Sequence, residues 1–161
     1  MSEKEKNELA LIDILTRLVT IYQSLLDIVK RKQSILAANN IEALKELLKE
    51  EESLVLQVES LEKQRLTLRE ANQWPVTLRE WAATLPDDQR KQVGAISRVL
   101  AETVSAICIQ NNINDEIIQH LSNFARYSLD LIHKVTSGPA YGCGGDVEPP
   151  SVHRSIVDRK V

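Results

Sequence analysis

Two histidines in the C-terminal third of the chain, His120 and His133, are the first candidates for metal ligands, because imidazole binds transition metals. Glu116 precedes His120 by four residues, whereas di-iron helical bundles use repeated Glu-x-x-His pairs that face inward. The sequence has no such pair. Cys143 and His153 offer only two further ligands, and a tetrahedral zinc site needs four. We therefore expect solvent-facing histidines and no metal or other cofactor.

Residues for nucleophilic catalysis are present, but no local catalytic signature surrounds them. The sequence has no Gly-x-Ser-x-Gly elbow, phosphate loop or dinucleotide fingerprint. The glycine-rich run at 142–145 follows a helical pattern and precedes none, whereas a phosphate cradle needs the start of a helix to supply aligned N–H groups. The sequence thus indicates a protein that is not an enzyme.

Asn111 and Asn114 are more informative, because they occupy consecutive positions of an otherwise aliphatic helical face. One interpretation is that each amide forms a hydrogen bond across a bundle and fixes its register. The other is that this stretch is not fully covered within the monomer, because an unpaired buried amide costs about 1–3 kcal/mol. The stretch would then form the floor of a docking groove.

Proline and glycine divide the chain into the elements that position these residues, and neither occurs before Pro75. From Leu11 to Ile35 apolar residues alternate at spacings of three and four, which predicts a helix with a heptad seam, with Lys32 keeping its amine in water. Residues 37–40 end this helix, and Asn39 with Glu42 has the form of a capping box for a second helix up to about Leu68. Such a short connection predicts an antiparallel hairpin.

A short helix is expected over residues 78–85, opened by Thr77 and Glu80 as a capping box, and a final helix starts after Pro86. At about 1.5 Å per residue, this final helix of roughly 50 residues is on the order of 75 Å long. Two parallel apolar stripes give it a wide face, which can contact two helices of its own bundle, or one helix of the bundle and one of a partner. We expect an all-α, elongated antiparallel helical bundle over residues 1–137, and a flexible Gly/Pro-rich tail over 138–161.

Charge and composition limit the partners. The net charge of −3 and the absence of a dense Lys/Arg block argue against nucleic acid. The charged first eight residues do not form a secretory signal, and no run approaches the ~18 apolar residues needed to span a bilayer. Cys108 and Cys143 are too few for a disulfide framework. We expect a cytoplasmic protein without membrane insertion.

Three segments together make the sequence resemble the FlgN-type flagellar export chaperones. The hairpin contains Ile41-Glu42-Ala43-Leu44, followed by Glu51-Glu52, Leu54, Leu61-Glu62 and Arg65, in the order familiar from the family. The long helix contains Asn111 and Asn114 ahead of Ile117-Ile118, which is similar to an Asn-x-x-Asn segment of the family. Tyr141-Gly142-Cys143-Gly144-Gly145 is similar to a Tyr-Gly-x-x-Gly signature. Residues 146–161 have no family pattern.

The resemblance implies a cytosolic chaperone that binds the C-terminal helical segments of the hook-filament junction proteins, FlgK and FlgL, and delivers them to the flagellar type III export gate. It implies that Tyr141, with Gly142 and Gly145, docks on the cytosolic domain of the gate. Because client contacts of similar proteins lie toward the C-terminal half, we expect them at Asn111, Ile113, Asn114, Ile117, Ile118, Leu121 and Phe124. The alternative is a structural coiled-coil scaffold or homodimer without a secretion client.

Overall fold

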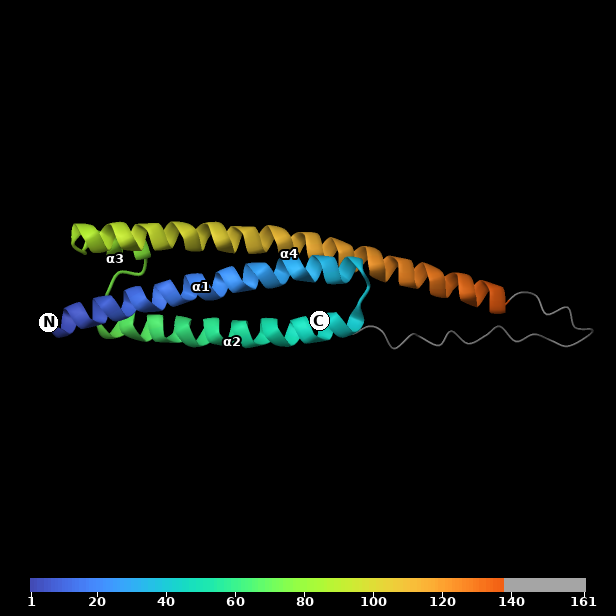
Figure 1. Cartoon of the computed structure of the whole chain (residues 1–161), viewed down its shortest axis with the longest axis horizontal. Helices are drawn as coiled ribbons and strands as arrows, with labels where there is room; N and C mark the ends of the chain where they lie inside the picture. The colour runs from blue at the N-terminus through green and yellow to red at the C-terminus, as the bar shows by residue number, and fades with distance from the viewer. Residues whose placement is uncertain (138–161) are drawn as a thin grey trace, which may run out of the picture. The chain divides into compact units, whose positions relative to one another are not determined.

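The computed structural model describes residues 1–137, which contain four helices and no strand. The helices are α1 (Glu3–Ala37), α2 (Ile41–Ala71), α3 (Leu78–Ala83) and α4 (Asp87–Thr136) (Figure 1). The predicted all-α bundle with a hairpin, a short linking helix and one long helix is therefore confirmed. The predicted tail, 138–161, lies outside the described residues. The chain divides into two units, Met1–Asn123 and Phe124–Val161, and α4 runs through the boundary.

Local side-chain caps account for where the helices begin. Ser2 and Glu5 form a reciprocal capping box at the start of α1, with Ser2 Oγ accepting from the Glu5 N–H at 3.2 Å. The helix thus begins eight residues before the seam that predicted it. At α3, Thr77 Oγ1 accepts from the Glu80 N–H at 3.2 Å, as expected, although the helix ends at Ala83 rather than at residue 85.

The turn of the hairpin differs from the prediction by one residue. Asn40, not Asn39, caps α2, and its Oδ1 accepts from the Ala43 N–H at 3.1 Å. Asn39 instead adopts a left-handed backbone conformation with φ of 51°, which asparagine tolerates better than most residues. Asn39 therefore turns the backbone after α1, and Asn40 caps the start of α2. Helix α2 then runs antiparallel to α1.

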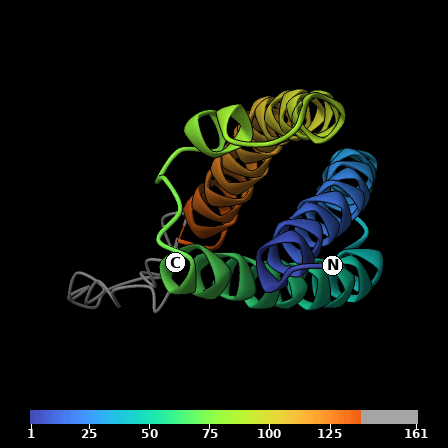
Figure 2. The ribbon, with the colours of Figure 1, turned by 90° about the vertical axis from the view of Figure 1, so that its left-hand side faces the viewer.

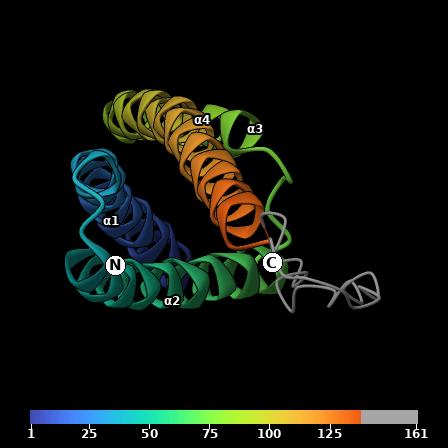
Figure 3. The same cartoon turned by 90° about the vertical axis from the view of Figure 1, so that its right-hand side faces the viewer.

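Within the unit Met1–Asn123, α1 lies between α2 and α4 (Figures 1 and 2). Helix α4 runs parallel to α1, because Val93 joins the core near Leu15 while Asn114, farther along α4, contacts Val29, farther along α1. The view from the other end shows the same three-helix arrangement, with α3 beside the start of α4 (Figure 3). The central position of α1 explains why it contributes most of the core and α2 little of it.

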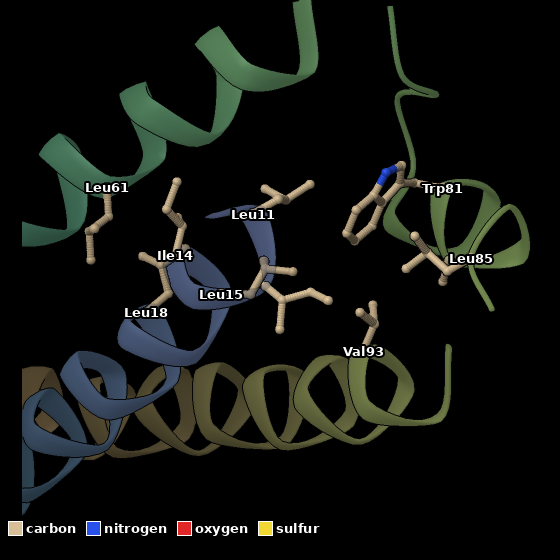
Figure 4. Packing of buried hydrophobic residues seen from close by; sticks show 10 residues of the cluster. Leu11, Ile14, Leu15, Leu18, Leu61, Trp81, Leu85 and Val93 are labelled. Carbon is tan, nitrogen blue, oxygen red and sulfur yellow. The ribbon is translucent and has the colours of Figure 1, made fainter. Parts of the chain in front are cut away.

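The core lies near the N-terminal end of α1, where four elements meet. Figure 4 shows leucine and isoleucine side chains of α1 gathered with Leu61 of α2, Trp81 of α3, Leu85 between α3 and α4, and Val93 of α4. Trp81 is almost fully buried, and its ring lies 5.3 Å from that of Trp74, centroid to centroid. Since aromatic side chains bury large areas, Trp81 anchors the short helix α3 and fixes where α4 begins.

Helices α1 and α4 each contain a window of 18 residues that is apolar enough to cross a bilayer by length and composition alone. These windows were not predicted from the sequence, because charged and polar residues interrupt their apolar runs. In α1 many of the apolar side chains belong to the core. A helix in the core of a soluble protein can also meet this criterion of length and hydropathy. In α4 only 11% of the window is buried, so this helix presents much of its apolar surface outward.

Candidate functional site

An apolar groove of about 360 Å³ lies where the hairpin turns and α4 passes over it. All three long helices contribute to its lining, and all of the lining belongs to the unit Met1–Asn123. The residues are Lys32, Ile35 and Leu36 of α1, Asn39 and Asn40 of the turn, Ile41, Leu44 and Leu48 of α2, and Ile118 and Leu121 of α4. We call this set the hairpin-end groove.

The groove is open because large apolar side chains at its edge are incompletely covered. Leu36 is buried at its floor, whereas Ile41, Leu48 and Ile118 remain exposed, the last with 46% of its surface. Ile35, Leu44 and Leu121 are partly buried. An exposed cluster of aliphatic residues is unfavourable in water and indicates a surface that a partner covers.

An ion pair between α1 and α2 lies beside the hairpin-end groove. Lys32 Nζ lies 2.6 Å from Glu51 Oε2, and the two side chains keep only 14% and 21% of their exposure. The expectation that Lys32 keeps its amine in water was wrong, because α2 brings the carboxylate of Glu51 against it. The neighbouring pair Arg31 and Glu50, at 3.2 Å, is much more exposed. The less exposed pair, Lys32 and Glu51, links α1 to α2 close to the groove.

The two asparagines of α4 occupy different environments. Asn114 is 2% exposed, and its Nδ2 donates to the Val29 carbonyl of α1 at 2.9 Å. Its Oδ1 accepts from Gln110 Nε2 at 3.2 Å, and Gln110 also donates to Gln33 Oε1 of α1 at 2.8 Å. Asn114 thus has the register-fixing role that the sequence left open, and its amide is not offered to a partner in this structure.

Asn111, three residues earlier, is only partly buried, and among residues 1–137 its side chain has no hydrogen-bond partner. This difference was not visible in the sequence, where both residues occupied the same seam. It arises because α1 closes over Asn114 but not over Asn111.

The other predicted contact residues fall into three groups. Ile118 and Leu121 line the hairpin-end groove. Ile113 is exposed and Ile117 partly buried on the same helix. Phe124, which belongs to the second unit, is 69% exposed. Tyr141, Gly142 and Gly145 lie outside the described residues.

Sequence reasoning placed the groove on α4 alone and missed its other two walls. Apolar residues flank the predicted polar turn at Asn39-Asn40 on both sides, namely Ile35, Leu36, Ile41 and Leu44. This pattern was the one feature of the sequence that pointed to a groove at the end of the hairpin. It was not sufficient, because only the parallel placement of α4 on α1 brings Ile118 to the end of the hairpin.

Helix α4 exposes large apolar side chains in both units. In the unit Met1–Asn123 these are Val104, Ile109, Ile113 and Ile118. In the described part of the second unit they are Phe124, Tyr127, Leu129, Leu131, Ile132 and Val135. Patches of this kind on soluble proteins mark interaction surfaces. The predicted surplus of apolar surface on this helix is therefore present.

The described residues contain no group of three or more His, Cys, Asp or Glu side chains that could hold a metal ion. His120 and His133 are exposed on α4, as is Cys108. Chemistry by these side chains would need partners that residues 1–137 do not bring near them. The geometry of this part of the chain is suited to binding an apolar segment.

Comparison with known proteins identifies the family of the chain. No curated protein and no solved structure matches the chain. The family model described as FlgN protein matches residues 4–149, which includes all of the described bundle except its first three residues. The chain therefore belongs to the FlgN family, a family of flagellar chaperones.

Proposed function

We propose that this protein is a cytosolic export chaperone that binds the C-terminal helical segments of the hook-filament junction proteins, FlgK and FlgL. By covering these segments it prevents premature assembly and delivers the clients to the flagellar type III export gate. Membership of the FlgN family supports the chaperone role. The observation that carries the client site is the hairpin-end groove, together with the exposed apolar residues of α4.

The proposed client contacts are the accessible members of the predicted set, namely Asn111, Ile113, Ile117, Ile118, Leu121 and Phe124. The hairpin residues Ile41, Leu44 and Leu48 are added as the opposite wall of the groove. Asn114 contributes indirectly, because its hydrogen bond to Val29 holds α4 at the position where Ile118 meets the hairpin.

The size of the groove suits a reversible complex. Three or four client side chains buried at about 1.5–3 kcal/mol each give roughly 5–12 kcal/mol gross. Ordering a disordered client segment takes about 2–5 kcal/mol of this. The remainder, from about 0 to about 10 kcal/mol, includes toward its upper end the roughly −8 kcal/mol of a 1 μM dissociation constant, and such an affinity suits a chaperone that must release its client.

Delivery to the gate is proposed to use Tyr141, with Gly142 and Gly145 shaping the segment around it. The Tyr-Gly signature falls within the matched range of the family, residues 4–149. It lies in sequence beyond the end of α4, so the proposed gate contact and the proposed client contact use separate parts of the chain.

Isothermal titration of the full chain with purified C-terminal segments of FlgK and FlgL tests the client role. We expect saturable binding of at least one segment with a negative heat-capacity change, because apolar area is buried. Absence of heat and of any shift in light scattering for both segments would refute the proposal.

The alternative is a structural scaffold or homodimer that uses the exposed face of α4 for self-association. Light scattering at several protein concentrations, with and without client segment, separates the two functions. A scaffold stays oligomeric on adding the segment, whereas a chaperone forms a complex of defined stoichiometry with it.

A further inference from the structure

A small cavity lies between α2, the linker of residues 72–77 and the start of α3, and Trp81 forms part of its wall. Its volume of about 10 Å³ is enough for one occupant of the size of a water molecule. All of its lining belongs to the unit Met1–Asn123, and none of it to the hairpin-end groove. We call this space the linker cavity.

The indole N–H of Trp81 is the first indication that the linker cavity binds a ligand. Trp81 is 2% exposed, and its Nε1 atom is buried without a hydrogen-bond partner among residues 1–137. Figure 4 shows this nitrogen on the edge of the ring that points away from Leu85 and Val93. A buried N–H without an acceptor is unfavourable, so an acceptor bound in the cavity would stabilise the folded chain.

The guanidinium group of Arg69 is the second indication, because its charge is poorly compensated. The Arg69 side chain lines the linker cavity and keeps only 25% of its exposure. Its one ion pair within residues 1–137 is with Glu70, at 3.8 Å, which is too long for a hydrogen bond. Glu70 is 72% exposed, so the solvent screens its charge strongly. Arg65, which also lines the cavity, is instead paired with Glu62 at 2.8 Å.

The chemistry of the occupant follows from the hydrogen-bonding groups that remain unused. Trp81 Nε1 and the Arg69 guanidinium can only donate. Thr77, the one hydroxyl residue of the lining, already accepts from the Glu80 N–H at 3.2 Å. A water molecule would need acceptors for its own two hydrogen atoms, whereas an anion accepts from both donors and compensates the charge of Arg69. We propose that the linker cavity binds a small monatomic anion such as chloride between Trp81 Nε1 and Arg69.

The bound anion would join two parts of the bundle. Arg69 belongs to α2, whereas Trp81 belongs to α3, the short helix that precedes α4. An anion that contacts both side chains would hold the linker against the hairpin. The folded chain should therefore become more stable as the chloride concentration rises through the dissociation constant. This site does not depend on the proposed client role, because it shares no residue with the hairpin-end groove.

Chloride titration of the ¹⁵N-labelled full chain by NMR tests the site. The chain has two tryptophans, so its spectrum has two indole N–H signals, and Trp74→Phe assigns the signal of Trp81. At constant ionic strength, with gluconate as the larger replacement anion, chloride should shift the Trp81 signal along a saturable curve. A Trp81 signal that does not respond to chloride, or that responds equally to gluconate, would overturn the proposal.

Arg69→Gln removes the charge and should weaken chloride binding about tenfold, because a charge-assisted hydrogen bond is lost. The matched control is Lys63→Gln, at an exposed position of the same helix, which changes the net charge equally and should leave the affinity within about twofold. Replacing gluconate with chloride should also raise the melting temperature of the wild type and the control more than that of Arg69→Gln. Equal affinity in the two variants, or an equal rise in all three proteins, would show that Arg69 does not hold the anion and would overturn the proposal.

Discussion

Asn114 of α4 donates a hydrogen bond of 2.9 Å to the backbone carbonyl of Val29 on α1. The bond joins residues 85 positions apart in sequence and lies inside the bundle, with Asn114 2% exposed. Because a buried amide without partners is costly, this pairing favours one register of α4 on α1 over its neighbours. The same register brings Ile118, one helical turn farther, to the end of the hairpin.

Replacing Asn114 with Asp should destabilise the fold by about 3 kcal/mol at neutral pH, because a buried charge then faces a carbonyl oxygen. The free energy of unfolding in urea measures the effect. Asn112→Asp, at an exposed position of the same helix, should change it by less than about 0.5 kcal/mol. Equal losses in the two variants would contradict the register role.

Ile118→Asp should weaken binding of the junction-protein segment by about tenfold or more, since it places a charge in the hairpin-end groove. Leu56→Asp is the matched control, because Leu56 is 58% exposed on α2 and belongs neither to the groove nor to the exposed apolar residues of α4. Both variants should retain the circular dichroism of the wild type. Calorimetry that finds the same affinity in both would move the client site elsewhere.

Tyr141→Ala should leave client affinity unchanged and reduce secretion of the junction proteins, because the proposed gate contact is separate from the groove. Tyr141→Phe tests whether the ring or the hydroxyl is needed. Secretion in a motile host and calorimetry on the purified variants are the two measurements. Normal secretion by Tyr141→Ala would remove the gate role.

The half-buried pair Lys32 and Glu51 should contribute more than the exposed pair Arg31 and Glu50. A double-mutant cycle with Lys32→Met and Glu51→Gln should give a coupling energy of about 1–2 kcal/mol. The corresponding cycle with Arg31→Met and Glu50→Gln should stay below about 1 kcal/mol and decrease in salt. Equal coupling in the two cycles would show that burial of the first pair does not strengthen it.

Burial, reinforced by the charge of Glu62 and opposed by Arg65, raises the pKa of Tyr22 above 10.0. The folded state therefore holds this proton more tightly than the unfolded state. The resulting stabilisation is complete below the unfolded pKa and is lost as pH rises through the folded pKa.

In a chain carrying Tyr127→Phe and Tyr141→Phe, Tyr22 is the remaining tyrosine, so tyrosinate absorbance reports its titration alone. Its midpoint should lie above that of the urea-unfolded chain. Glu62→Gln should lower the midpoint, whereas Arg65→Gln should raise it. A midpoint equal to that of the unfolded chain would contradict the role of burial.

The sequence predicted the helices well because their signals are local. Seam periodicity, the cap at Thr77 and the proline at position 86 each act within a few residues, and the bounds of α2 and α4 follow from them. The errors were also local. Asn39 and Asn40 are both suitable caps, and only the backbone path of the turn distinguishes them.

The sequence by itself determined an all-α chain, a hairpin and a long helix with more apolar surface than its own bundle covers. These features follow from the periodicity of apolar residues and the positions of proline and glycine, which depend only on residues close together in the sequence. Tertiary structure alone decided which of two similar asparagines is buried, that Lys32 meets Glu51, and that the walls of the groove come from three helices. These facts depend on the register between segments up to 85 residues apart, and side-chain packing, not local propensity, fixes that register.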